Sequence, residues 1–306
     1  MPRSPLERAS IKIGAVINDA SGTLSPRQAE NRLEEIKRHL KARVSHGCLA
    51  IVPGGQVRRE IERLRGLGVN VLIVGGGDGT ISTAASLLAD TEIALAVLAL
   101  GTKNHFARDL GIPTGPAEAI KLLDRMNVQQ IDLGEVNGHL FINNATLGLY
   151  PKIVEQREEK RQKPGWRKWS AQIAAALIVL WRIPKIRLTV EEKDGRTGYK
   201  TPFLFVGNNE YQGRLMFDSH RSTLSGGNLW LCAAHASGMM SLLHMAWQLR
   251  TRGIQGIVNI ETRFLKEVTI YSMRRRERVA VDGENLKIET PLRFNIRRKS
   301  LRVVVP

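Results

Sequence analysis

Two almost uninterrupted apolar runs, Val69–Val74 (VNVLIV) and Ile93–Leu100 (IALAVLAL), constrain the fold more than any other feature. A strand that is apolar along its whole length has no side facing water, which is typical of a parallel sheet covered on both faces. The preceding chain alternates shorter strands with amphipathic helices: Ile11–Asn18, Pro26–Ala42, Cys48–Val52 and Gln56–Leu67. This alternation predicts an α/β domain with three layers, two of helices and one of strands.

The pattern changes near residue 130. Short strand-like segments follow, separated by turn signals: Val128–Val136, Gly138–Thr146, Ile186–Glu192, Pro202–Asn208, Asn228–Ala233, Arg263–Tyr271, Arg278–Val281 and Pro291–Ile296. Two helices are expected among them, at Trp166–Trp181 and Met239–Arg250. We therefore predict that residues 1–130 form the α/β domain and residues 131–306 form a mostly antiparallel β-sandwich. A return of the last strand to the first domain is left open.

The chain is strongly basic, with 46 Lys and Arg against 29 Asp and Glu in 306 residues, a net charge of +17. This excess favours a polyanionic partner: nucleic acid, an anionic membrane or a phosphorylated ligand. The two cysteines, Cys48 and Cys232, have no metal-ligand spacing and predict no disulfide framework, so we expect a reducing cytosol. Residues 1–10 are polar and predict no secretory signal, and the apolar run Ala171–Trp181 is too short to span a bilayer.

The strongest local signal is Gly76–Thr80 (GGDGT), which follows an apolar strand and precedes a helix expected at Ile81–Leu88. Glycines there let backbone N–H groups approach phosphates, and the helix N-terminus adds partial positive charge. Asp78 would repel phosphate, so we expect its carboxylate to contact Mg²⁺ or to accept a proton. A tight turn in which Asp78 caps the helix is the alternative. The spacing fits neither the lysine-containing phosphate loop nor the dinucleotide fingerprint.

Four segments in chain order resemble the motifs of the diacylglycerol kinase catalytic family, which is grouped with NAD kinases. They are Asn18–Gly22 (NDASG), Gly76–Thr80 (GGDGT), Leu100–Arg108 (LGTKNHFAR) and Val281–Glu284 (VDGE). The resemblance implies a nucleotide-binding α/β domain, a β-rich second domain and an active site in the cleft between them. It also implies ATP and Mg²⁺ as cosubstrates and a lipid hydroxyl as the acceptor.

Carried over residue by residue, the resemblance implies a nucleotide site made of Asn18, Ser21, Gly22, Gly76, Gly77, Asp78, Gly79, Thr80, Thr102 and Asn104. It places Asp282 and Glu284 near the acceptor hydroxyl. These two residues and Asp78 are the implied catalytic residues, and Glu284 is the implied general base. Phosphoryl transfer does require positioned phosphates, charge neutralisation and an acid that orients the acceptor. Without the resemblance, Asp282-Gly283-Glu284 is more simply a β-turn with two exposed acids.

This sequence also departs from the family pattern. Asp19 stands where proline is usual, Lys103 replaces a small residue, and His105 replaces an acid. The stretch Thr223–Trp230 lacks both acids that family members use near a structural Mg²⁺. We therefore expect no structural metal site in the protein, while catalytic Mg²⁺ is still expected with ATP, with Asp78 as its candidate contact.

Basic residues surround two tryptophans ahead of an apolar helical face: Lys160, Arg161, Lys163, Trp166, Arg167, Lys168 and Trp169. Such a segment is typical of an interfacial membrane anchor. The segment Met239–Arg250 is a second candidate, and packing of both apolar faces on the β domain is the alternative for each.

Together these features predict a cytoplasmic lipid kinase that meets its substrate at the inner, anionic face of a membrane. A nucleic-acid partner is not expected because no motif that reads DNA or RNA is present. A homodimer is left open. The alternatives are an NAD kinase, which shares GGDGT and for which Asn209-Glu210 offers a faint likeness, and an inactive basic protein that binds nucleotide or membrane.

Overall fold

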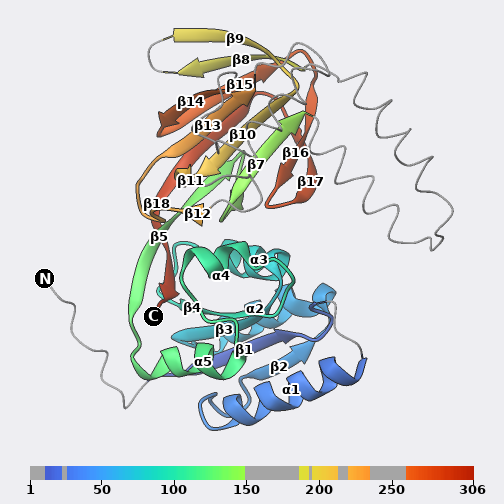
Figure 1. Ribbon diagram of the computed structural model, residues 1–306, viewed down its shortest axis with the longest axis vertical. Helices are drawn as coiled ribbons and strands as arrows, with labels where there is room; N and C mark the ends of the chain where they lie inside the picture. Colours follow the sequence, from blue (N-terminus) through green and yellow to red (C-terminus); the bar gives the residue numbers. More distant parts are fainter. Residues whose placement is uncertain (1–10, 23–25, 149–185, 193–194, 213–219, 235–259) are drawn as a thin grey trace, which may run out of the picture. The chain divides into compact units, whose positions relative to one another are not determined.

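The computed structural model describes residues 11–22, 26–148, 186–192, 195–212, 220–234 and 260–306 (Figure 1). The chain divides into two compact units, one formed by residues up to Leu133 together with Arg298–Pro306, the other by Gly134–Arg297. It passes between the units twice, within β5 (Val128–Val136) and within β18 (Leu292–Val304). The helices expected at Trp166–Trp181 and Met239–Arg250 lie outside the described residues.

A parallel sheet forms the centre of the first unit. Its strands are β1 (Ile13–Asn18), β2 (Leu49–Val52), β3 (Val71–Gly76), β4 (Ala94–Ala99) and the end of β18, in the order β2-β1-β3-β4-β18. Every residue of β3 and β4 is buried, as their continuous apolar character predicts. The last strand joins through Arg302 and Val303, which pair in parallel with Ala94 and Leu95.

Helices cover both faces of this sheet. Figure 1 shows α2 (Val57–Gly66) and α3 (Asp78–Leu88) on one face and α1 (Pro26–Lys41) and α5 (Pro116–Lys121) on the other. The short elements η2 (Gly54–Gln56), α4 (His105–Asp109) and η3 (Leu122–Asp124) complete the unit. The predicted three-layer α/β architecture is confirmed. Among the helices that the structure describes, none has the length and apolar character needed to cross a membrane.

The second unit consists of two sheets. The six-stranded sheet is antiparallel and contains, in spatial order, β14 (Ile260–Leu265), β13 (Leu229–Ala234), β10 (Phe203–Asn208), β7 (Asn144–Gly148), β16 (Arg276–Val281) and β17 (Glu284–Glu289). The other sheet contains β9 (Gly195–Thr201), β8 (Ile186–Glu192), β15 (Glu267–Ser272) and β18, with β5 and β6 (His139–Phe141) beside them. A small pair, β11 (Tyr211–Gln212) and β12 (His220–Arg221), stands apart.

Both sheets of the second unit contribute to one hydrophobic core. Alternate residues of a strand point to the same side, and the inward ones are fully buried, including Leu204 and Leu231 from one sheet and Val190, Ile270 and Phe294 from the other. This shared core confirms the predicted, mostly antiparallel sandwich.

Some sequence-based expectations for the strands were wrong. Arg263–Tyr271, expected as one strand, forms β14 and β15 in different sheets, because the chain crosses between the sheets at Lys266. The strand β17 was not expected, because its sequence ENLKIE is mostly polar and only Leu286 and Ile288 pack on the core.

Leu72, in the middle of β3, tests how much the buried sheet stabilises the first unit. Leu72 is 0% exposed, and Leu72→Ala should lower the free energy of unfolding by about 2–5 kcal/mol, because a cavity replaces the side chain. Leu67, which is 44% exposed, is the matched control, and Leu67→Ala should cost no more than about 0.5 kcal/mol. Chemical denaturation of both variants measures the difference, and equal losses would contradict the assigned core.

Candidate active site

Three chain segments lie at the carboxyl ends of neighbouring parallel strands in the first unit. Asn18–Gly22 follows β1, Gly76–Thr80 joins β3 to α3, and Gly101–Asn104 follows β4. Every residue predicted for the nucleotide site lies in one of these segments. In open α/β sheets, ligands bind outside the carboxyl ends of the strands. The fold therefore brings the predicted residues to one edge of one sheet.

Two asparagines shape these loops from within. Asn18 donates from Nδ2 to Thr80 Oγ1 (2.9 Å), and its Oδ1 accepts the Ala20 N–H (3.1 Å). Asn104 has a left-handed backbone conformation (φ 51°), donates to Gly101 O (2.8 Å) and accepts the Gly101 N–H (3.0 Å). Both amide groups therefore hold loop geometry, and Asn18 also fixes the position of the Thr80 hydroxyl.

The helix α3 begins at Asp78, three residues before the expected start at Ile81, and β3 continues through Gly76. Only Gly77 separates strand from helix. The Ile81 N–H bonds to Gly77 O (3.1 Å), and the N–H groups of residues 78–80 lie ahead of this bond, where a helix leaves its donors unpaired. Such a terminus attracts anions through these donors and through the helix dipole.

The glycines of this segment have two different roles. A Cβ at Gly75 would lie 2.7 Å from Ile17 Cδ1, and one at Gly76 would lie 2.4 Å from Thr80 Cβ, so packing within the unit requires both glycines. A Cβ at Gly79 would meet nothing within 4 Å, and one at Gly77 would meet only Gly101 Cα at an ordinary 3.6 Å. The fold does not require these two glycines, and they leave open space beside the unpaired N–H groups.

Asp78 is half-buried at the first residue of α3. Within the described part of the chain its carboxylate has no hydrogen bond or ion pair, and the residue preceding the helix is Gly77, with no side-chain cap. Asp78 therefore does not act as the helix cap that the sequence left as an alternative. A half-exposed carboxylate oxygen is the type of ligand that Mg²⁺ prefers.

Metal-binding clusters of protein side chains are a separate question. Across the residues that the structure describes, no group of three or more His, Cys, Asp or Glu side chains is placed to hold a metal ion. In the stretch Thr223–Trp230, the Thr223 hydroxyl accepts the Ser225 N–H (3.2 Å) and Leu224 is buried. This stretch is held by its own turn hydrogen bonds and by packing.

Asp282 and Gly283 form the two-residue turn of the β16–β17 hairpin in the second unit. Both have positive φ angles (47° and 89°), as an Asp-Gly hairpin turn requires. The Asp282 carboxylate accepts three backbone hydrogen bonds, at Oδ2 from Ile142 (2.8 Å) and at Oδ1 from Asn143 (2.8 Å) and Asn144 (3.1 Å). Charge-assisted bonds of this kind are strong, so Asp282 fixes the hairpin to the segment between β6 and β7.

Buried polar groups hold the carbonyl side of the same segment. Arg221, 5% exposed, donates to Ile142 O and to Asn143 Oδ1 (3.1 Å), and its guanidinium lies over the Tyr211 ring, 5.6 Å from the centroid. Asn208 Nδ2 donates to Ile142 O (3.0 Å), and the Tyr211 hydroxyl donates to Asn143 O (2.9 Å). The segment is thus held on both sides, by Asp282 and by this network.

The sequence analysis missed this network because it treated Gly138–Thr146 as a single strand. In the structure β6 ends at Phe141 and β7 begins at Asn144. The signal was available, since two consecutive asparagines, Asn143 and Asn144, are unfavourable within a strand.

Glu284 differs from its neighbour Asp282. It is the first residue of β17, pairs across the turn with Val281, and is exposed. Its carboxylate has no hydrogen bond or ion pair to any residue that the structure describes. Of the two acids in the D-G-E motif, one is held by three backbone donors and the other has no partner among the described residues.

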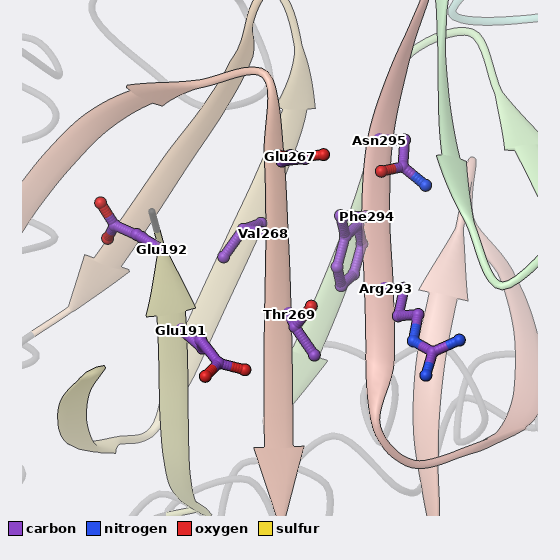
Figure 2. A pocket seen from close by; sticks show the side chains of 8 residues that line it. All are labelled: Glu191, Glu192, Glu267, Val268, Thr269, Arg293, Phe294 and Asn295. Atoms are coloured by element: carbon purple, nitrogen blue, oxygen red, sulfur yellow. The ribbon is translucent and has the colours of Figure 1, made fainter. Parts of the chain in front are cut away.

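A hollow of about 310 Å³ lies on the second unit (Figure 2). It is lined by Glu191, Glu192, Glu267, Val268, Thr269, Arg293, Phe294 and Asn295, and none of the predicted site residues is among them. A hydrogen bond from the Tyr271 hydroxyl is the largest cause that holds the pKa of Glu191 below its ordinary value, and a hydrogen bond from Arg196 is the next largest. The carboxylate therefore stays charged at neutral pH, and with three glutamates in its lining the hollow does not suit a phosphate group.

The family model that matches this chain covers mainly the first unit. Residues 12–136 match the family model of the diacylglycerol kinase catalytic domain. The chain is 47% identical over 111 residues to a probable lipid kinase YegS-like protein of Pseudomonas aeruginosa, 36% of each chain. It is 38% identical over 146 residues to a probable lipid kinase YegS-like protein of Pseudomonas fluorescens, which covers 46% of this chain and 48% of that protein. The matches thus span less than half the length of these curated relatives.

Solved structures extend the likeness to both units. The crystal structure of a diacylglycerol kinase from Bacillus anthracis, 19% identical, superposes with a TM-score of 0.68 over 98% of each chain. A second crystal structure from that organism, 20% identical, gives a TM-score of 0.74 over 98% of this chain and 99% of the other. At these identities the likeness shows a shared fold.

The different hydrogen bonding of Asp282 and Glu284 can be tested by measuring the free energy of unfolding of single variants. Asp282→Ala should lower the free energy of unfolding by about 2–4 kcal/mol, because backbone donors lose a charged acceptor. Glu284→Ala, two residues away in the same hairpin, should change it by less than about 0.5 kcal/mol. Chemical denaturation measures both values. A negligible loss in Asp282→Ala would contradict its role as an anchor of the hairpin.

Proposed function

We propose, on the premise that residues 12–136 belong to the diacylglycerol kinase catalytic-domain family, that this protein is an ATP-dependent lipid kinase. Its acceptor is the hydroxyl of a diacylglycerol-like or other long-chain lipid. The observation that carries the proposal is the open N-terminus of α3, where residues 78–80 present unpaired N–H groups and Gly77 and Gly79 leave space. The names of the relatives, probable lipid kinases, support a lipid as the acceptor.

The first unit binds the nucleotide phosphates in this proposal. The N–H groups of residues 78–80 donate to phosphate oxygens, and Thr80, held by Asn18, directs its hydroxyl to the same place. Ser21, Gly22, Thr102 and Asn104 form the walls contributed by the two flanking loops. Asp78 offers a carboxylate oxygen to Mg²⁺, which when bound neutralises the charge that develops on the phosphates.

The second unit supplies the group that acts on the acceptor. Glu284 has an exposed carboxylate with no partner among the described residues, so it can accept the proton of a lipid hydroxyl as general base. Asp282 is engaged by three backbone N–H groups, and we assign it the positioning of Glu284 rather than proton transfer. The location of both acids in one cleft with the nucleotide stays a prediction.

A lipid acceptor implies work at a membrane surface. The net charge of +17 suits the anionic inner face of a membrane, where clustered Lys and Arg side chains are attracted to acidic lipids. Cytoplasmic location and peripheral membrane binding are therefore part of the proposal. A homodimer, left open by the sequence, is not needed for it.

Gly79→Asp tests the nucleotide site through binding. ATP with Mg²⁺ should stabilise the parent protein by mass action, by about 2.7 kcal/mol at a hundredfold excess over Kd. Gly79→Asp should abolish the ATP-induced rise in Tm, because a carboxylate enters the phosphate space. Without ATP its Tm should stay level or rise slightly, because Gly79 has room for a side chain and an acid favours a helix N-terminus.

The control is Gly66→Asp at the end of α2, where a Cβ also meets nothing within 4 Å. It adds the same charge and should keep the ATP-induced rise. A full rise in Gly79→Asp would remove residues 76–80 from the nucleotide site.

Glu284→Gln tests the chemical step. The substitution keeps the shape of the side chain but removes the proton acceptor, so turnover should fall by about 10²–10⁴-fold. ATP-induced stabilisation should not change. The assay is transfer of radiolabel from ATP to a panel of diacylglycerol, phosphatidylglycerol and a sphingoid base, with NAD as a further acceptor.

Glu267→Gln, an exposed acid of the same unit, is the matched control and should keep parental turnover. Near-parental turnover in Glu284→Gln would transfer the role of base to Asp78. Label on NAD and on none of the lipids would support the NAD kinase alternative and reject the lipid kinase.

A further inference from the structure

The turn between β15 and β16 exposes an apolar side chain. Met273 is 86% exposed, the highest value among the large apolar side chains that the structure describes. Exposure of an apolar methionine side chain to water is not favourable. Its flexible thioether chain adapts well to irregular apolar surroundings. We call residues Met273–Arg276 the basic turn, because three arginines follow the methionine.

The basic turn belongs to a larger cluster of positive charge. Arg278 on β16 and Lys287 on β17 lie directly opposite each other in the hairpin. Two acids partly balance the cluster: Glu277 pairs with Arg274 (3.7 Å) and Glu289 pairs with Arg276 (2.8 Å).

Two of the cluster's cations are not neutralised in this way. Within the described residues, Lys287 has no ion pair, and Arg275 has none at bonding distance, although the Glu289 carboxylate interacts with its charge. Arg274 and Arg276 remain 66% and 62% exposed in spite of their partners. The basic turn and the adjoining parts of β16 and β17 therefore present accessible cations together with one exposed apolar side chain.

Backbone hydrogen bonds hold the basic turn in place. Thr290 donates from Oγ1 to Arg274 O (2.6 Å) and from its N–H to Arg275 O (3.0 Å). The Arg274 N–H bonds to Ser272 Oγ (3.2 Å). These bonds engage the main chain and leave the Met273 and Arg275 side chains outside, so little main-chain ordering is required when a partner binds.

We propose that the basic turn, with Arg278 and Lys287, is the surface through which this protein docks on a bilayer that contains anionic lipids. Arginines around an exposed apolar tip match the boundary between acidic headgroups and acyl chains, where both kinds of side chain are stabilised. A nucleic acid would match the charges but not Met273, and the turn has no aromatic side chain on which bases could stack.

The charge on another sheet face of the second unit supports this choice. The hollow on β8, β15 and β18 carries Glu191, Glu192 and Glu267, with Arg293 as its one cation (Figure 2). Arg196 pairs with Glu191 (2.7 Å) and Arg263 pairs with Glu192 (2.8 Å), so the charges of this face roughly balance and it offers acidic headgroups no excess of cations. Within the second unit, charge therefore favours the basic turn over the hollow as the side that meets an anionic bilayer.

This inference rests on the proposed lipid kinase function, and its test is separate from catalysis. The full chain is sedimented without ATP with vesicles of phosphatidylcholine alone or with a third of phosphatidylglycerol. Arg275→Glu/Lys287→Glu should bind the anionic vesicles at least about tenfold more weakly than the parent, because each cation near such a surface contributes and salt screens it.

The control is Arg187→Glu/Lys200→Glu, an exposed cross-strand pair on β8 and β9 of the same unit. It makes the same change in net charge and should bind within about twofold of the parent. Equal weakening in both double variants would mean that net charge alone drives binding, and would overturn the assignment. Thermal unfolding of each variant checks that the fold is intact.

Met273→Ser separates apolar insertion from charge. It should weaken binding to anionic vesicles about three- to tenfold while leaving the salt dependence unchanged, because it removes buried apolar area and no charge. If Arg275→Glu/Lys287→Glu loses affinity for a DNA duplex but not for vesicles, the surface serves a nucleic acid and the proposal fails. Vesicle binding without lipid phosphorylation would leave the docking surface standing and reject the kinase.

Discussion

Burial of both faces of the parallel sheet is the constraint on which the first unit depends. Every side chain of β3 and β4 is committed to packing, so the strands cannot carry exposed polar groups. Polar and reactive residues are thereby restricted to the loops at the strand ends. Because the strands are parallel, the loops after β1, β3 and β4 lie at one edge of the sheet, where open α/β sheets bind their ligands.

The second unit positions its candidate base by a different means. An antiparallel sandwich leaves hairpin turns exposed at its rim, where a lone carboxylate would sample many positions. Here Asp282 and the buried Arg221 hold the two sides of one short segment, Ile142–Asn144, and so tie the β16–β17 hairpin to the sheet interior. A polar network whose members are mutually satisfied fixes geometry more firmly than apolar packing does.

Sequence reasoning reached the architecture and the motif residues because both have local signatures: continuous apolar strands, a glycine-rich strand–helix junction and an Asp-Gly turn. It could not distinguish the role of Asp282 from that of Glu284, because the residue type alone does not show whether a carboxylate accepts backbone hydrogen bonds or is exposed to solvent. It also could not find the contact between Arg221 and Asn143, because no periodicity links residues so far apart in the chain. The strand β17 was not predicted because its sequence is mostly polar. It is an edge strand that contributes only two residues to the core.

The path of β18 has a consequence for the order in which the protein is made. Arg302 and Val303 complete the sheet of the first unit beside β4, although nearly all other residues of that unit precede Gly134. During synthesis β1 to β4 emerge early, with β4 still an open edge, and the second unit must be made before the missing strand emerges. Until that moment β4 is an unpaired apolar edge of the kind that chaperones recognise. Completion of the sheet formed by the earliest strands therefore waits until the second unit has been made.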